Sequence, residues 1–405
     1  MQAYYERRTF SDELNGQSLK FISKPGIPQW DQITPSARLL SEHIQITKPT
    51  RLLIYGCGHG AMPLALARKN PDGEHWVTDV LSLSLKLTAE TFEENGLSIP
   101  LYFPDINSSL EKSDPFDMVV IDLPKGRQLA QRWLAEAFTV LHTGGQLFIA
   151  GANKEGIRSL LKDAEALFGS GTILAYKKGN RIARFIKRDS SLPPLSWLHS
   201  PGILPGSWIE FEAELPSGVL RLRSLPGVFS SNKLDEGTHL LLQHLEIPSD
   251  ARVLDLGCGY GVIGLQAARM NAARVDLVDD NLYAVAASQE NIRITGLKNA
   301  QAIPSDALEA IWDRHYNLIV TNPPFHSGKD VEYQITQAFI QQSPQVLEPD
   351  GEFWLVANKF IPYERIMQPI FRRVERIVET NRYYVLRAVT RRGSRSRPSP
   401  VRSVG

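Results

Sequence analysis

The chain lacks most of the features that mark secreted, membrane-spanning or metal-binding proteins. Its 405 residues include 2 cysteines, and no apolar run approaches the roughly 20 residues that cross a bilayer. No apolar stretch follows the charged amino terminus, and the formal net charge is only +1. These absences exclude a disulfide-rich scaffold, and they predict a soluble, cytoplasmic protein without a signal peptide or a membrane partner. We expect it to be a monomer.

What the chain does have is an internal duplication. The segment RLLIYGCGHG at residues 51–60 returns about 200 residues later as RVLDLGCGYG at residues 252–261. Ala-Asn-Lys follows a later apolar run in both halves, at residues 152–154 and 357–359. Cys57 and Cys258 are equivalent positions in the two loops, so a disulfide between them is geometrically implausible. The duplication and the length together predict two domains.

Each half alternates short apolar runs with amphipathic stretches, which predicts a mostly parallel sheet with helices on both faces. We therefore expect an α/β fold with two tandem Rossmann-like domains. In the second half the expected strands cover residues 253–256, 275–278, 317–321 and 352–357, and helices cover 262–269 and 283–292. The first half repeats the pattern with strands at 117–121 and 146–150, and residues 209–215 and 219–223 alternate as in a hairpin.

The expected domain boundaries follow from composition. We assign residues 1–188 to a first domain, 189–207 to a linker rich in turn-forming residues, 208–390 to a second domain and 391–405 to a basic tail. Residues 177–188 contain six lysines and arginines and no acid, and residues 391–402 contain five arginines and no acid. Either stretch is able to contact phosphate, or is simply an exposed strand and a solvated tail.

The glycine loop of the second half predicts a nucleotide-like cofactor. Gly257, Gly259 and Gly261 let a ligand approach the backbone closely where a strand turns into a helix. The pattern also fits a nicotinamide site, but Asp255 would repel a pyrophosphate and suits the ammonium group of a methionine moiety. Asp279 ends the next strand, where an acid accepts hydrogen bonds from both hydroxyls of a ribose.

Two further stretches of the second half have two interpretations each. Asp306 follows the third strand region and either contacts the amino group of an adenine or only forms a turn. Residues 229–238 precede a leucine-rich helix, and they either cap its start or line the cofactor pocket.

The tetrapeptide Asn322-Pro323-Pro324-Phe325 follows the fourth strand and faces the same crevice as the glycine loop. The Asn322 side-chain oxygen and the Pro323 carbonyl are able to accept the two hydrogens of an exocyclic amine, and Phe325 to stack on its ring. This holds the amine lone pair towards a sulfonium methyl group, and such a donor requires neither a metal nor a strong base. The alternatives are a turn with an asparagine cap and, for His326, a base or a surface residue.

The first half lacks these groups. Asp255 is matched by Ile54, and the tetrapeptide is matched by Asp122-Leu-Pro-Lys125, which has no aromatic side chain. Only the glycines and Asp79 are retained. We therefore expect a degenerate domain that binds RNA and supports the catalytic half.

Residues 229–237, 255–261, 322–326 and 356–359 together resemble the bacterial ribosomal RNA guanine-N2 methyltransferases, a family that includes small-subunit methyltransferase C and large-subunit methyltransferase G. The resemblance covers nearly the whole chain. It implies two tandem class I methyltransferase domains of which only the second is catalytic, S-adenosylmethionine as cofactor, a flipped-out guanine, and ribosomal RNA or a ribosomal particle as partner. It gives cofactor contacts to Asp255, Gly257, Gly259, Gly261, Asp279 and Asp306, and target-amine contacts to Asn322, Pro323 and Phe325.

Two other functions remain open from the residues. Adenine-N6 and glutamine methyltransferases use similar tetrapeptides, although the duplication argues against them. A non-catalytic, RNA-binding ribosome assembly factor that keeps a cofactor pocket is the alternative from another class.

Overall fold

The computed structural model describes residues 4–102, 114–270, 272–324 and 330–391. It divides the chain into two compact units. The amino-terminal unit comprises residues 5–210 and 224–227, and the carboxyl-terminal unit comprises residues 211–223, those from 228 onwards and the amino-terminal end up to Tyr4. Residues 189–207 thus lie in the amino-terminal unit, where Leu198 and Ile203 are buried.

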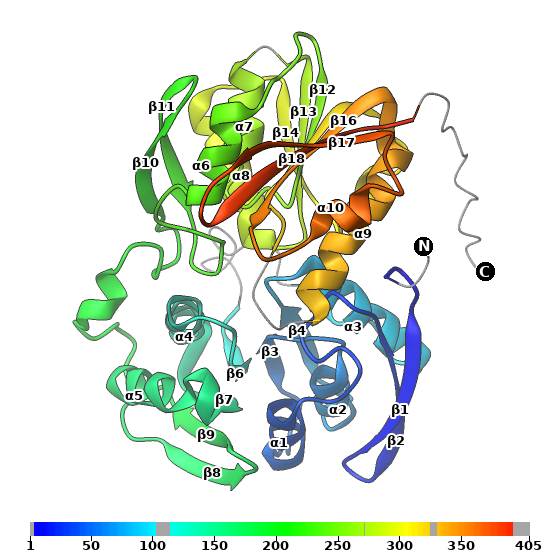
Figure 1. Ribbon diagram of the computed structural model, residues 1–405. Coiled ribbons are helices and arrows are strands. Elements are labelled where there is room, and N and C mark those ends of the chain that lie inside the picture. The colour runs from blue at the N-terminus through cyan, green and yellow to red at the C-terminus, as the bar shows by residue number, and fades with distance from the viewer. Residues whose placement is uncertain (1–3, 103–113, 271, 325–329, 392–405) are drawn as a thin grey trace. The chain divides into compact units, whose positions relative to one another are not determined.

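A seven-stranded sheet forms the centre of the carboxyl-terminal unit, in the order β14-β13-β12-β15-β16-β18-β17 (Figure 1). The first five strands in this order are parallel, and β18 and β17 are antiparallel additions that sequence patterns did not reveal. The strands are β12 (Arg252–Leu256), β13 (Arg274–Asp279), β14 (Ala300–Pro304), β15 (Tyr316–Thr321), β16 (Leu347–Asn358), β17 (Arg373–Glu379) and β18 (Tyr383–Val389). The helices are α6 (Glu236–His244), α7 (Val262–Arg269), α8 (Leu282–Thr295), α9 (Asp330–Val346) and α10 (Tyr363–Met367), with a 3-10 turn η4 (Glu309–Ile311).

The amino-terminal unit repeats this topology with the strand order β5-β4-β3-β6-β7-β9-β8. Its strands are β3 (Arg51–Tyr55), β4 (Glu74–Thr78), β5 (Leu101–Tyr102), β6 (Phe116–Asp122), β7 (Leu141–Ala152), β8 (Thr172–Lys177) and β9 (Asn180–Ile186). Its helices are α1 (Pro35–His43), α2 (Ala61–Arg68), α3 (Ser82–Glu94), α4 (Arg127–Val140) and α5 (Ile157–Phe168), with 3-10 turns η2 (Asn153–Glu155) and η3 (Ser196–His199). The predicted tandem of mostly parallel sheets is confirmed.

Each unit also has a two-stranded hairpin outside its main sheet. The predicted hairpin of the second half is confirmed as β10 (Ile209–Leu215) and β11 (Gly218–Ser224), and the first half has its equivalent in β1 (Arg8–Leu14) and β2 (Gln17–Ser23). A polar side chain on a helix binds each hairpin: Asn291 of α8 accepts from the Arg223 amide at 2.7 Å, and Thr91 of α3 accepts from the Ile22 amide at 3.0 Å.

The central strands explain the position of a ligand site in the carboxyl-terminal unit. Val253, Leu254 and Leu256 of β12 and Leu318 and Ile319 of β15 are buried, as expected for strands covered by helices on both faces. The strand order reverses between β12 and β15, because β13 lies on one side of β12 and β15 on the other. A crevice at the carboxyl ends of strands that flank such a reversal is where α/β sheets bind ligands.

Candidate active site

The glycine loop of the carboxyl-terminal unit connects β12 to α7 in a conformation that glycine makes possible. Gly257, Gly259 and Gly261 have φ angles of 74°, 56° and 88°. A Cβ on Gly261 would lie 2.7 Å from the Ser288 hydroxyl, so this glycine allows close packing of the helix. A Cβ on Gly259 would meet nothing within 4 Å, so the loop presents open space at its centre. Backbone at that point is accessible to a ligand.

Asp279 lies at the end of β13 and stabilises the glycine loop by hydrogen bonding. Its Oδ2 accepts a hydrogen bond from the Gly259 amide at 2.9 Å, and its Oδ1 accepts from the Asn281 amide at 2.9 Å. Each oxygen of a carboxylate has a second lone pair. The Asp280 amide also hydrogen-bonds to this carboxylate, and Asp279 keeps acceptor capacity for a hydroxyl group of a ligand while it holds the glycine loop in place.

Asp255 is fully buried in β12, directly below the glycine loop. Its Oδ2 accepts a hydrogen bond from the Gly264 amide at 2.8 Å, whereas its Oδ1 has no hydrogen-bond partner in the described part of the chain. Burial raises the pKa of this carboxyl to about 7, with the charge of Asp279 as a further cause. A buried acid with one unused oxygen suits a cationic ligand group, which would lower its pKa again.

Asp306 lies in the loop after β14 and is buried. Its Oδ1 accepts a hydrogen bond of 2.6 Å from the hydroxyl of Tyr4, which belongs to the same unit although it is 302 residues away. Sequence reasoning missed Tyr4, because no pattern links the amino terminus to this loop. The contact orders the Asp306 side chain next to the proposed cofactor site.

Asn322 follows β15 at the same edge of the sheet. The nitrogen of its side-chain amide is hydrogen-bonded and, within the described ranges, the oxygen is not. The amide nitrogen donates to Asp235 Oδ2 at 3.1 Å and to the Thr238 hydroxyl oxygen at 2.7 Å. The amide oxygen is buried and has no partner among the residues that the structure describes. Pro323 is buried and Pro324 half-buried, whereas Phe325 and His326 lie outside the described residues.

The segment before α6 caps the start of that helix, as one of its two interpretations predicted, and its lining of a cofactor pocket stays a prediction. Asp235 is the N-cap of α6, since its Oδ2 accepts from the Thr238 amide at 2.9 Å. The same oxygen receives the Asn322 amide. Sequence reasoning singled out this segment but missed the contact with Asn322, because the two residues are 87 positions apart.

The equivalent positions of the amino-terminal unit have a different chemistry. Asp79 repeats the contacts of Asp279, with its oxygens accepting from the amides of Gly58 at 3.2 Å and Leu81 at 3.0 Å. Asp122 stands where Asn322 stands in the other unit, and burial raises its pKa to about 7. Ile54 is buried and offers no polar group. The amino-terminal unit therefore retains a glycine loop that is hydrogen-bonded to an aspartate, but it lacks the equivalents of Asp255 and Asn322.

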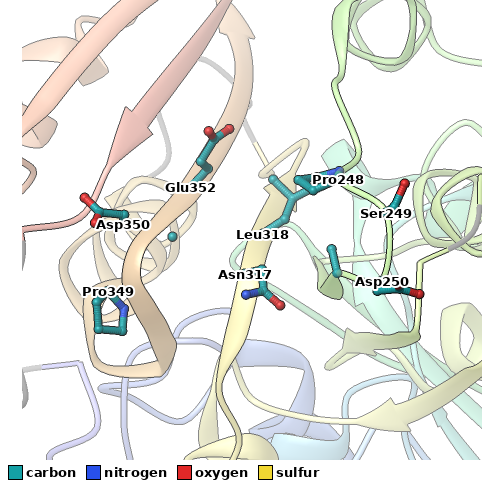
Figure 2. Close-up of a pocket in the computed structure, with 10 residues that line it drawn as sticks. Pro248, Ser249, Asp250, Asn317, Leu318, Pro349, Asp350 and Glu352 are labelled. Atoms are coloured by element: carbon teal, nitrogen blue, oxygen red, sulfur yellow. The ribbon is translucent and has the colours of Figure 1, made fainter.

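Two other features of the chain lie apart from this site. Cys57 and Cys258 are free and buried, and burial raises the pKa of both thiols, so both are protonated at neutral pH. A cavity of about 240 Å³ lies at the amino ends of β15 and β16, opposite the edge where Asn322 lies. Figure 2 shows Asp350 and Glu352 on one side of it and residues 248–250 on the other.

The described residues contain neither a membrane-spanning helix nor a cluster of metal ligands. No helix within the described ranges is both long and apolar enough to cross a membrane. No group of three or more His, Cys, Asp or Glu side chains in the same ranges is placed to hold a metal ion.

Comparison with known proteins agrees with the geometry. The methyltransferase small domain family matches residues 18–184 and again residues 219–387. Ribosomal RNA small subunit methyltransferase C of Shewanella sediminis is 32% identical over 84% of this chain and 98% of its own length. The protein of the same name from Psychromonas ingrahamii is 34% identical over 68% of this chain and 76% of its own length.

A solved structure resembles the whole chain. It is the T. thermophilus 16S rRNA N2 methyltransferase in complex with AdoMet and guanosine, with a TM-score of 0.78 and 29% identity over 96% of this chain and 99% of that one. Both halves match the same family, and the relatives match across both halves. The chain therefore belongs to the ribosomal RNA small subunit methyltransferase C family, and each of its halves is a methyltransferase small domain.

Proposed function

We propose that the carboxyl-terminal unit transfers a methyl group from S-adenosylmethionine to the N2 amine of a guanine in small-subunit ribosomal RNA, in the cytoplasm. The observation that carries this proposal is the Asn322 amide, whose nitrogen is hydrogen-bonded and whose buried oxygen has no partner among the described residues. The names of the relatives support the RNA substrate, and the guanosine bound to the T. thermophilus enzyme supports the base.

The residues present fit the cofactor. The oxygen of Asp255 that has no partner among the described residues suits the ammonium group, and the open centre of the loop at Gly259 allows the cofactor to approach. The position of Asp279 at the end of β13 supports its assignment to the ribose hydroxyls. Asp306 is proposed for the adenine amino group. S-adenosylmethionine supplies a methyl group on a sulfonium, and the electron pair of the broken carbon–sulfur bond stays on sulfur.

The chain's own part is to prepare the amine. The N2 lone pair of guanine is delocalised into the ring, so it must be localised before it can form a bond to carbon. The Asn322 side-chain oxygen and the Pro323 carbonyl accept the two amine hydrogens and thereby direct the lone pair to the methyl group. Pro324 keeps the segment rigid and Phe325 stacks on the base. After transfer the nitrogen is cationic and releases one proton to water.

Deletion of the gene tests the substrate. We expect ribosomal RNA from cells without this protein to lack one N2-methylguanosine, measured by mass mapping of nucleosides and fragments. Loss of an N6-methyladenosine instead would favour the adenine alternative. Unchanged ribosomal RNA together with a ribosome assembly defect would favour the non-catalytic assembly factor.

The pKa of Asp255 predicts a pH-dependent affinity for S-adenosylmethionine. Because the carboxyl is protonated below its pKa of about 7 and the ammonium group requires the carboxylate, the affinity is expected to rise about tenfold between pH 5.5 and 7. Asp255→Asn should weaken binding and flatten this rise. Isothermal titration calorimetry of both proteins across this range is the measurement, and an unchanged slope in the variant would contradict the assignment.

The substitution Asp255→Asn should weaken cofactor binding but stabilise the ligand-free protein at high pH. Since burial raises the Asp255 pKa from 3.8, the unfolded chain releases this proton first as the pH rises. The free energy of unfolding of the wild-type protein therefore falls between pH 4 and about 7. Compared with the wild type at the same pH, Asp255→Asn should be more stable at pH 8 than at pH 5. Thermal unfolding of the two proteins at both pH values checks the sign.

We also propose that the amino-terminal unit binds RNA through its outer hairpin, β8–β9. Tyr176 is 59% exposed, and the Arg181 guanidinium lies 4.7 Å above its ring. Asn153 connects the two, since its oxygen accepts from Arg181 Nε at 2.9 Å and its amide donates to the Tyr176 hydroxyl at 3.4 Å. Lys177 and Lys178 are exposed beside this pair. An ordered aromatic ring flanked by cations suits base stacking and phosphate contacts.

Removal of the two lysine charges tests this surface. The double variant Lys177→Gln/Lys178→Gln is expected to bind substrate RNA more weakly and to reduce the slope of log affinity against log salt by about 1.5. Its affinity for S-adenosylmethionine should not change. The matched control is Lys48→Gln/Lys162→Gln, which removes two charges elsewhere in the same unit. Equal slopes for the two double variants would mean that the hairpin has no special role.

A further inference from the structure

We infer that Asp235 and Thr238 are positioning residues that fix the orientation of the Asn322 amide, so that its oxygen and not its NH2 group faces the target amine. The inference rests on the proposed function, because it assigns the groups that prepare Asn322 for that reaction. Neither residue needs to touch the substrate. Their effect on catalysis is exerted through one side chain.

The contacts converge on the amide nitrogen. Asp235 Oδ2 lies 3.1 Å from Asn322 Nδ2 and 2.9 Å from the Thr238 amide nitrogen, so one oxygen serves both the helix cap and Asn322. The Thr238 hydroxyl donates to the same oxygen at 3.4 Å, and its own oxygen receives Asn322 Nδ2 at 2.7 Å. Both hydrogens of the Asn322 amide thus have acceptors.

Chemistry excludes the reversed amide. A carboxylate has no hydrogen to donate, so Asp235 accepts an N–H from Asn322 and repels its oxygen, while the Thr238 hydroxyl donates to that carboxylate at 3.4 Å. If Asn322 were rotated by half a turn, its oxygen would face two oxygens and its two hydrogens would lose their acceptors. The observed orientation leaves the amide oxygen buried and without a partner among the described residues, which is unfavourable until an amine hydrogen reaches it. The site is therefore prepared for a donor before the substrate binds.

The amino-terminal unit shows the same positions with the polarity reversed. Thr34 is the N-cap of α1 and accepts from the Ala37 amide at 3.1 Å, as Asp235 does in α6. The Thr34 hydroxyl donates to Asp122 at 3.5 Å, and the Ser36 hydroxyl also hydrogen-bonds to this carboxyl. In this unit the acid follows the strand and the hydroxyl groups lie at the cap. The cap and the strand-end group have therefore changed together, which keeps donors opposite acceptors and removes the oriented amide.

Asp235→Asn is the first test. Asparagine is as good an N-cap as aspartate, so α6 and the thermal stability should be retained. An asparagine at 235 is able to donate to Asn322, so it no longer selects one amide orientation. We expect kcat to fall by about 100-fold, comparable to the loss of one preorganised hydrogen bond at a reacting group. The KM for S-adenosylmethionine should stay within about threefold of the wild type, as no cofactor contact is changed.

A second pair of variants tests the hydroxyl. Thr238→Val keeps the side-chain shape and removes the acceptor for Asn322, and we expect kcat to fall by about tenfold. Thr238→Ser restores the hydroxyl and should recover most of the activity. If valine and serine at this position behave alike, the contribution of Thr238 is only structural, and that result would overturn its part of the inference.

The decisive measurement combines Asp235→Asn with Asn322→Ala under single-turnover conditions. If Asp235 acts only through Asn322, its substitution should cause no additional loss in the Asn322→Ala background. A full additional loss there, or a wild-type kcat for Asp235→Asn alone, overturns the inference. The proposed function fails separately, because it is Asn322→Ala by itself that would then retain a normal rate.

Discussion

Asn322→Ala is expected to lower kcat by about 1000-fold while the affinity for S-adenosylmethionine stays unchanged. The substitution removes the buried oxygen that has no partner within the described ranges and that is proposed to accept an amine hydrogen, and with it the means of localising the lone pair. No cofactor contact is proposed for Asn322, so binding of the cofactor should not respond. Transfer of a labelled methyl group to ribosomal RNA in a single turnover measures the rate, and calorimetry measures the affinity.

The matched control for this variant is in the other unit. Asp122→Asn introduces the corresponding amide after β6, where the cap is a threonine and Asp255 is replaced by Ile54. We expect this variant to methylate RNA at the wild-type rate. A normal rate for Asn322→Ala combined with a loss for Asp122→Asn would show that the wrong unit has been taken as catalytic.

Asp279→Ala should weaken the binding of S-adenosylmethionine by at least about 100-fold. The carboxylate accepts from the amides of Gly259 and Asn281, so its loss releases the glycine loop as well as the two acceptor sites proposed for ribose hydroxyls. Hydrogen bonds to a charged group are worth about 1.5–3 kcal/mol each, and two of them account for a loss of this size. Calorimetry with S-adenosylmethionine or its demethylated product measures it.

Asp79→Ala provides a control with nearly the same geometry. Asp79 is buried, whereas Asp279 is partly buried, and Asp79 likewise accepts from two backbone amides, those of Gly58 and Leu81. Its removal should destabilise the amino-terminal unit and leave cofactor affinity unchanged. If Asp79→Ala abolished binding and Asp279→Ala did not, the cofactor site would have to be assigned to the amino-terminal unit.

Much of the fold was predictable because its signals are local. The strand and helix ranges of the second half agree with β12, α7, β13, α8, β15 and β16 to within a few residues, since apolar periodicity and glycine positions reflect the backbone of each segment. The antiparallel strands β8, β17 and β18 were not predicted, and β9 was anticipated only as one interpretation of the basic stretch at residues 177–188. Of these, β17 has four charged residues among seven and therefore resembles an exposed loop or strand of any kind.

The sequence by itself determined that the chain is a duplication and that Asn322, Asp255 and Asp279 lie near strand ends and a glycine loop, and it predicted that the second copy carries the groups for the reaction. These are properties of residue type and of position along the chain. Only the tertiary structure decided how the Asn322 amide is oriented. The fold brings Asp235, at the start of α6, into contact with Asn322, which is 87 residues away in the sequence. It also decided that one oxygen of Asp255 has no partner in the part of the chain that the structure describes, since burial and hydrogen bonding arise only when distant segments pack together.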